Sequence, residues 1–316
     1  MRALHWDGAR LQLRETYPEP PEQKNWALVR VHLAGICSTD LQIFKGYMGF
    51  VGVPGHEFVG EVVAGAPSLH GKRVVGEINF ACESCEWCRQ QLRRHCPKRQ
   101  VMGILSADGS FAEYLALPVA SLHAVPENVP NEAAVFTEPL AAAFEILEQI
   151  HLHPGAEVVV LGDGKLGLLC AQVLHVAGGQ VTLIGKHEKK LAALRQLGVR
   201  GVIRTDWQSH PADVVVEATG TTEGLAQAMA LVRPRGTLVL KSTVVQAHNL
   251  SLAPLVINEV TVVGSRCGPF SPALQALAQG QLSVTPLIDR TYPLTEGVAA
   301  VQHTATPGVL KVLLRM

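Results

Sequence analysis

The sequence lacks a long hydrophobic run, an excess of either charge, and a secretory signal. No apolar stretch reaches the roughly 18 residues that a transmembrane helix needs. Lysine plus arginine and aspartate plus glutamate number 27 each, so the chain offers no basic field for nucleic acid and no polybasic stretch for anionic lipid. The first residues, MRALHWDGARLQLRE, alternate like a strand and lack the apolar core of a signal peptide. We therefore expect a cytoplasmic protein that binds neither nucleic acid nor membrane.

The order of strand-like and helix-like segments predicts two domains, for which 316 residues suffice. Up to about Leu117, short alternating strands are broken by Gly and Pro, which is typical of an antiparallel β domain. A helical pattern runs from Glu132 to Ile150. Beyond it, six apolar strands alternate with helices and predict a doubly wound parallel sheet: EVVVLG, QVTLIG, GVI, DVVVEATG, GTLVLKS and VTVVGS. After Gly268 too little sequence is left for a third domain, so it most simply returns to the first.

A Gly-x-Gly-x-x-Gly turn lies between the first of these strands, at residues 158–161, and a helical pattern. Gly162 permits the tight turn, Gly164 allows backbone amides to approach a pyrophosphate, and Gly167 allows the helix to pack on the strand. Lys165 and Leu166 complete this predicted cofactor-binding turn. Because strand and helix flank the glycines, the motif favours dinucleotide binding over an ordinary glycine-rich turn.

The tip of the second strand predicts which dinucleotide is bound. An acidic residue there binds the ribose 2′-hydroxyl of NAD, whereas a small residue beside cations leaves room for a 2′-phosphate. Gly185 holds the usual acidic position and Lys186 and His187 follow it, which favours NADP(H) over NAD(H). The alternative is that these cations only form a solvated helix start. Thr219 and Arg266, after the fourth and sixth strands, are further candidate cofactor contacts. The alternative for Thr219 is a simple strand-ending turn, and an exposed side chain is the default interpretation of Arg266.

Four of the seven cysteines crowd together with the spacing C-x2-C-x2-C-x7-C, as Cys82, Cys85, Cys88 and Cys96. Four thiolates can close a tetrahedron around zinc and leave no open position, so this spacing predicts a structural site. Two disulfides or four buried thiols are the alternatives, and the tight spacing favours a shared metal over both.

A second set of metal-ligand types is dispersed along the chain. Cys37 lies in AGICSTD, His56 and Glu57 lie in PGHEFVGEV, and Glu138 precedes a proline at a helix start. A catalytic zinc needs three protein ligands and one exchangeable water, and Cys, His and Glu are all competent ligands. Taken singly, a buried Cys or a hydrogen-bonded core His would be the commoner explanation.

The motifs CSTD, PGHEFVGEV, CESCEWCRQQLRRHC, DGSFAEYL and TEPLA, together with the glycine turn, resemble the zinc-dependent medium-chain dehydrogenases, the alcohol and polyol dehydrogenase group. The resemblance spans nearly the whole chain. It implies an α/β protein in which a GroES-like antiparallel β catalytic domain, at residues 1–126 and 268–316, accompanies a Rossmann domain at residues 127–267. It also implies two zinc ions per subunit and a dimeric or tetrameric homo-oligomer.

The resemblance assigns roles to individual residues. Cys37 and His56 are implied ligands of the catalytic zinc, with Glu57 or Glu138 as the third. Thr39 matches the hydroxyl that takes the substrate's proton, and Asp40 matches the carboxylate behind the histidine ligand. Where the family often has a relay histidine this chain has Gln42, which cannot carry a proton.

These parts favour a zinc-dependent oxidoreductase that moves hydride between a secondary alcohol or polyol, or its ketone, and a nicotinamide cofactor. The first alternative is a non-catalytic dinucleotide-binding protein that retains the fold and the structural zinc. A zinc-free quinone or enoyl reductase is the second alternative, and it should lack both groups of ligands.

Overall fold

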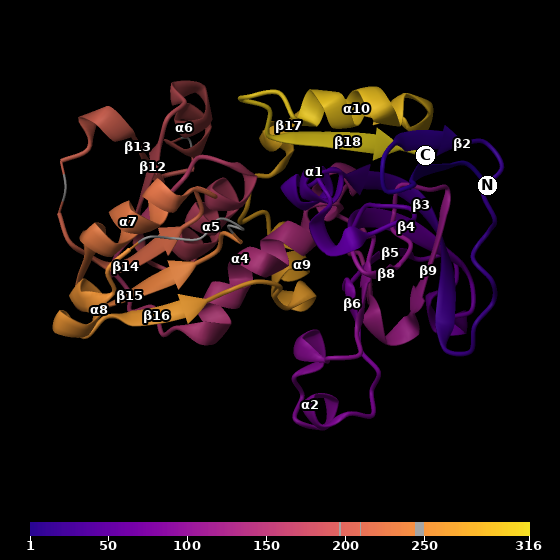
Figure 1. Ribbon diagram of the computed structural model, residues 1–316, viewed down its shortest axis with the longest axis horizontal. Coiled ribbons are helices and arrows are strands. Elements are labelled where there is room, and N and C mark those ends of the chain that lie inside the picture. Colours follow the sequence, from indigo (N-terminus) through magenta and orange to yellow (C-terminus); the bar gives the residue numbers. More distant parts are fainter. Residues whose placement is uncertain (196, 209, 244–249) are drawn as a thin grey trace. The chain divides into compact units, whose positions relative to one another are not determined.

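The computed structural model describes residues 1–195, 197–208, 210–243 and 250–316, which form two compact units (Figure 1). Unit 1 comprises Met1–Glu138, Leu274–Gln279 and Val284–Met316, and unit 2 comprises Pro139–Ala273 and Gly280–Ser283. The domain limits read from the sequence stay predictions. None of the helices in these ranges is both long and apolar enough to cross a membrane.

The main sheet of unit 1 has the order β10-β5-β4-β3-β18-β17, and β9 also pairs with β3. Its strands are β3 (Trp26–Gly35), β4 (Glu57–Ala64), β5 (Arg73–Gly76), β9 (Tyr114–Pro118), β10 (Leu122–Ala124), β17 (Ile288–Pro293) and β18 (Lys311–Arg315). All pairings are antiparallel except that of β17 with β18. Because β18 pairs with β3, the last strand of the chain joins a sheet formed by strands of the N-terminal part.

The rest of unit 1 consists of short elements around this sheet. β1 (Ala3–Trp6) pairs with β2 (Leu11–Arg14), and a small sheet joins β6 (Asn79–Phe80), β7 (Gln100–Met102) and β8 (Ser106–Ala107). The helices are α1 (Ser38–Ile43), α2 (Glu86–Arg89), α3 (Asn131–Ala134) and α10 (Gly297–Thr304). Trp6, Ile43 and Phe50 pack into a core cluster, which fixes α1 against the first strand. The loop that carries α2 projects from the sheet of this unit (Figure 1).

Unit 2 is a six-stranded parallel sheet in the order β13-β12-β11-β14-β15-β16. The strands are β11 (Glu157–Leu161), β12 (Gln180–Gly185), β13 (Arg200–Ile203), β14 (Ala212–Glu217), β15 (Val232–Leu240) and β16 (Thr261–Gly264). Numbered from β11 as the first strand, this order is 3-2-1-4-5-6, the doubly wound arrangement of dinucleotide-binding folds. Residues 158–161 are buried because β11 lies at the centre of the sheet. The predicted parallel sheet is confirmed.

The helices of unit 2 follow its strands. α5 (Lys165–Val176), α6 (Glu188–Arg195), α7 (Thr222–Leu231) and α8 (Ala253–Ile257) connect successive strands, while α4 (Thr137–Gln149) enters the unit and α9 (Phe270–Ala278) leaves it. The segment EKKLAALRQLG, at residues 188–198, is one of the helices expected between the strands; α6 is described up to Arg195, and residue 196 lies outside the described residues. The single helical pattern from Glu132 to Ile150 is two helices, α3 and α4, and the Thr137 hydroxyl at the start of α4 donates to the carbonyl of Ala134 at the end of α3.

Candidate functional site

Asp40 links two of the predicted ligands of a catalytic metal. Cys37 precedes α1, and its backbone N–H donates to Oδ2 of Asp40 over 2.7 Å. The other carboxylate oxygen, Oδ1, lies 3.3 Å from Nδ1 of His56, which comes just before β4. Asp40 is completely buried and His56 is 3% exposed. One buried carboxylate therefore orients both the loop of Cys37 and the ring of His56.

The surroundings of His56 fit a metal ligand. Nδ1 of His56 and Oδ1 of Asp40 are close but poorly aligned, and both are buried without a hydrogen-bond partner among the described residues. A ring whose Nδ1 faces a carboxylate directs Nε2 to the other side, as in carboxylate–histidine–metal arrangements. Burial would lower the pKa of His56, but the charge of Asp40 and the contact with Cys37 raise it well above its usual value. The negative groups around His56 therefore favour a positive charge on the ring.

Glu57 completes this group but is bound by a lysine. Ligand atoms of Cys37, His56 and Glu57 all lie within 4.8 Å of one another. Lys311, from β18, donates its Nζ to Oε2 of Glu57, and both side chains are 1% exposed. The ammonium also lies 5.4 Å from the centre of the Phe136 ring. Burial would lower the pKa of Lys311, but the charges of Glu57, Cys37 and Glu138 raise it, so the lysine keeps its charge beside Glu57.

The other predicted residues of this site lie around the three ligands. Glu138 is in the first turn of α4, is half-buried and is not one of the three tightly grouped ligands, although its charge acts on Lys311. The Thr39 hydroxyl lies 3.8 Å from the Cys37 sulfur. Gln42 is exposed on α1. The arrangement therefore offers a thiol and an imidazole that could hold a metal, a neighbouring hydroxyl and a choice of two carboxylates.

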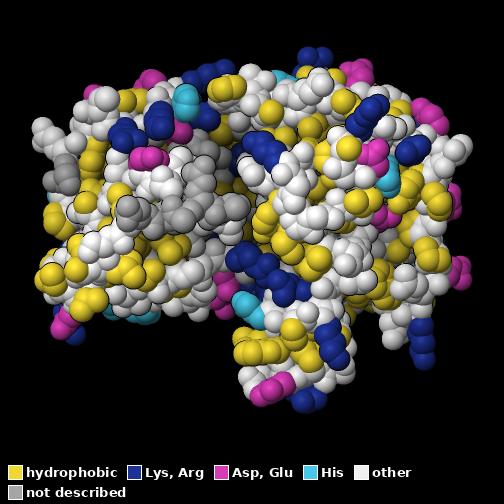
Figure 2. All heavy atoms as spheres, in the orientation of Figure 1, with side chains coloured by type: hydrophobic (Ala, Val, Ile, Leu, Met, Phe, Trp, Pro, Cys, Tyr) yellow, Lys and Arg dark blue, Asp and Glu magenta, His cyan; other side chains and the backbone are white. Residues whose placement is uncertain are grey.

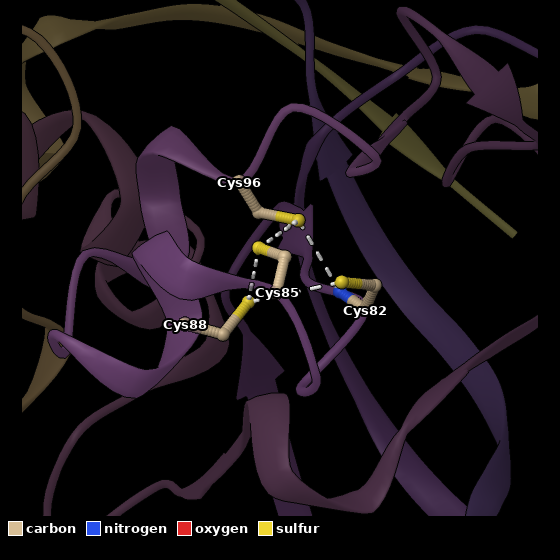
Figure 3. A group of neighbouring side chains, drawn as sticks. All are labelled: Cys82, Cys85, Cys88 and Cys96. Carbon is tan, nitrogen blue, oxygen red and sulfur yellow. Dashed lines mark hydrogen bonds between the residues drawn. The ribbon is translucent and has the colours of Figure 1, made fainter.

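The four clustered cysteines point toward a common centre (Figure 3). Their sulfur atoms lie within 4.8 Å of one another, with Cys85 3.4 Å from Cys88 and 3.7 Å from Cys96. Zn–S bonds of about 2.3 Å at tetrahedral angles separate sulfur atoms by about 3.8 Å, so the group matches a zinc tetrahedron. All four cysteines are free, which rules against disulfides as the reason for the spacing. Bonds from the backbone N–H of Ser84 and its hydroxyl lower the pKa of Cys82 to about 6, which favours a thiolate.

The predicted cofactor turn in unit 2 needs its glycines. Gly162 has φ +111°, and a Cβ there would lie 2.6 Å from the carbonyl oxygen of Ala218. A Cβ on Gly167 would collide with the carbonyl oxygen of Gly162. By contrast, a Cβ at Gly164 would meet no atom of the described chain within 4 Å. Gly162 and Gly167 are therefore packed against neighbouring backbone, whereas the space beside Gly164 is open. A phosphate can approach the backbone amides there, at the start of α5.

The tip of β12 contacts this turn through Asp163. Oδ2 of Asp163 accepts the backbone N–H groups of Lys186, over 2.8 Å, and His187, over 2.7 Å, and lies 2.8 Å from Nδ1 of His187. Lys186 is exposed and its charge acts on Glu223, at the start of α7. The predicted cations therefore begin a segment that is fixed to the glycine turn by a buried carboxylate.

The remaining predicted cofactor contacts lie at or after strand ends. Thr219 follows β14, and both its N–H and its hydroxyl donate to Oε1 of buried Glu217. Arg266 follows β16, is exposed, and its carbonyl accepts a hydrogen bond from Lys241. Lys165 and Leu166 open α5 and are half-buried. These strand ends share the carboxyl edge of the parallel sheet, where ligands bind in such folds.

Comparison with known proteins shows the family of this chain. The alcohol dehydrogenase GroES-like domain matches residues 23–127, and the zinc-binding dehydrogenase family matches residues 166–279. A sorbitol dehydrogenase of Halalkalibacterium halodurans is 30% identical over 322 residues, covering 94% of this chain and 93% of that protein. The chain belongs to the zinc-dependent medium-chain dehydrogenases.

Two further similarities describe this dehydrogenase's relatives. D-arabitol-phosphate dehydrogenase of Enterococcus avium is 28% identical over 323 residues, covering 94% of this chain and 91% of that one. A Sinorhizobium meliloti protein described as a zinc-binding dehydrogenase bound to NADP superposes with a TM-score of 0.92 at 25% identity, covering 100% of this chain and 99% of that chain. The resemblance seen in the sequence is confirmed, as are the GroES-like and Rossmann folds and an enzyme of the alcohol and polyol dehydrogenase group.

Sequence reasoning missed two charged residues of these sites. Lys311 lies among the apolar residues of VLKVLLRM, where a lysine between apolar neighbours signals a buried partner. Asp163 lies between two glycines of a turn predicted to receive a pyrophosphate, where an acid is unexpected.

Proposed function

We propose that this dehydrogenase interconverts a secondary alcohol or polyol and its ketone with NADP(H) as the hydride carrier. The observation that carries the proposal is the buried group of Cys37, His56 and Glu57, with Asp40 behind the histidine. Relatives named sorbitol and D-arabitol-phosphate dehydrogenases support the substrate class. Gly185, Lys186 and His187 support NADP(H), and one similar structure contains NADP.

The side chains of unit 1 divide the work of alcohol activation. Zinc at this site would act as a Lewis acid that lowers the pKa of a substrate hydroxyl, as it lowers that of bound water to about 7. Cys37 and His56 would hold it, and Asp40 fixes the ring that binds. Because Lys311 holds Glu57, we assign the third ligand position to Glu138. The Thr39 hydroxyl, beside Cys37, would accept the proton that leaves the substrate and pass its own to Glu138, Glu57 or water, since Gln42 cannot carry it.

A substrate screen with a matched pair of variants tests this proposal. The zinc-loaded enzyme is assayed on sugars, polyols and simple secondary alcohols with NADP+ and NAD+, following the reduced cofactor. We expect turnover of at least one polyol, with the better kcat/KM for NADP+. Thr39→Val should lower kcat about 100-fold, which is the contribution of a positioned proton-transfer group. Gln42→Ala, on the exposed side of the same helix, is the control and should stay within about 3-fold. Silence of the loaded enzyme across the panel contradicts the proposal.

Two zinc ions per subunit and a cytoplasmic location belong to the same proposal. The first would be bound at the Cys37 site and the second by the four clustered cysteines. Seven free thiols are typical of a reducing compartment, since disulfides form mainly in oxidising ones.

We also propose that two copies associate through β16, in a dimer or a dimer-based tetramer. In the described ranges β16 pairs with β15 alone, so its outer edge is unpaired. Val262 on β16 and the α8 side chains of Val256 and Ile257 are 44%, 77% and 77% exposed. Figure 2 shows hydrophobic side chains gathered over the β16 and α8 end of unit 2. An exposed apolar edge strand is a ready pairing surface. Light scattering should give a dimer or tetramer that Val262→Lys dissociates; a monomeric wild type contradicts this.

A further inference from the structure

The space beside the tip of β12 is filled by a side chain from another segment. A Cβ on Gly185 would lie 2.7 Å from Cβ, 2.9 Å from Cγ and 2.8 Å from Oδ2 of Asp163. Gly185 is the position at which dinucleotide-binding folds usually carry the acid that binds the adenosine ribose. The glycine is therefore required because Asp163 already occupies the room of a side chain at residue 185. A carboxylate is present at the tip of β12 although the strand itself ends without one.

The contacts of Asp163 leave one of its oxygens available. Oδ2 takes the backbone N–H groups of Lys186 and His187 and the Nδ1 contact of the His187 ring. Within the described residues, Oδ1 receives no hydrogen bond, and Asp163 keeps 8% of its surface exposed. Burial would raise the pKa of Asp163, but the bonds from Lys186 and His187 lower it, so the group is an anion at neutral pH. It is held in one orientation with one acceptor oxygen unused.

We propose that Asp163 is a specificity-determining residue of the cofactor site, a carboxylate carried by the glycine turn that favours a ribose 2′-hydroxyl and opposes a 2′-phosphate. This inference rests on the proposed dinucleotide-dependent function. A carboxylate accepts a hydrogen bond from a hydroxyl, whereas a phosphate dianion is repelled by it. Lys186 and His187 act in the opposite direction, because cations attract the phosphate. The choice between NADP(H) and NAD(H) is then a balance, and Asp163 limits the preference for NADP(H) that the two cations create.

The matched variants are Asp163→Asn and Glu188→Gln. An asparagine Oδ1 can keep the two backbone hydrogen bonds while the charge is removed. Glu188 is a second acid near the tip of β12, in the first turn of α6. Its carboxylate pairs with Arg195 and is exposed, so its removal controls for a general loss of negative charge. Asp163→Ser, which keeps a smaller acceptor, is the second variant if asparagine disturbs the turn.

Binding is measured by calorimetry on the zinc-loaded enzyme with ADP-ribose and its 2′-phosphorylated form. Neither compound contains nicotinamide, so the readout does not depend on turnover. We expect Asp163→Asn to shift the ratio of the two dissociation constants about 10-fold toward the 2′-phosphorylated ligand, Asp163→Ser to shift it in the same direction, and Glu188→Gln to leave it within about 2-fold. An unchanged ratio in both Asp163 variants overturns the inference. If wild type binds neither compound, the proposed function fails instead, so the two failures are distinguishable.

Discussion

The buried ion pair between Lys311 and Glu57 allows a stability prediction of stated size. Both side chains are 1% exposed, so Lys311→Met leaves the carboxylate of Glu57 buried without its counter-charge. Breaking a buried pair from one side costs about 3 to 5 kcal/mol, whereas replacing both partners by neutral groups is often close to neutral. For a domain of 150 to 250 residues, about 2 to 4 °C of melting temperature accompany each kcal/mol. We therefore expect Lys311→Met to lower the melting temperature by about 6 to 20 °C.

The assay is thermal unfolding followed by tryptophan fluorescence. Three of the four tryptophans, Trp6, Trp26 and Trp87, lie in unit 1, and a Trp207→Phe background removes the signal of unit 2. The control is the double variant Glu57→Gln with Lys311→Met, which should recover most of the loss. A single variant that melts within about 2 °C of wild type, or a double variant that melts as early as the single one, would refute the assignment of a buried charged pair.

Three further predictions concern other parts of the chain. Cys88→Ser should remove one zinc per subunit and make the loop at residues 82–96 sensitive to protease, because four sulfurs enclose one centre; equal zinc content in variant and wild type argues against the four-sulfur site. Gly185→Ala should destabilise the enzyme by about 1 to 3 kcal/mol in chemical denaturation, because its Cβ meets Asp163; a variant as stable as wild type contradicts this contact. Burial raises the pKa of Cys170 to about 11, so the folded enzyme at pH 8 should leave this thiol unlabelled by iodoacetamide in peptide mapping; rapid labelling of the native protein contradicts its burial.

Local sequence signals predicted the parts of the molecule that local chemistry determines. The apolar residues 158–161 indicated a buried strand, and the glycines after them indicated the turn that the structure contains. The spacing of the four cysteines likewise predicted their convergence, because neighbouring residues in one loop can reach a common point. The return of the chain's end to the first domain was predicted only from the shortness of what remained, and the pairing of β18 with β3 supplies its physical reason.

The features that escaped prediction depend on contacts between distant segments. Glu57 and Lys311 are 254 residues apart, so nothing near either one shows that they form a pair. The absence of an acid from the tip of β12 was visible, but the sequence did not show that Asp163 of the preceding turn fills that space. The break between α3 and α4 escaped the helical pattern because buried residues continue through it.

Zinc content per subunit tests the central claim, a catalytic metal held by Cys37 and His56, most directly. Elemental analysis of the purified wild type should give two zinc ions per subunit. Cys37→Ala should retain one zinc and lose turnover, while Cys170→Ala, which removes a buried thiol distant from both ligand groups in the sequence, should retain two. A wild type that binds one zinc, and keeps it in Cys37→Ala, would contradict the account.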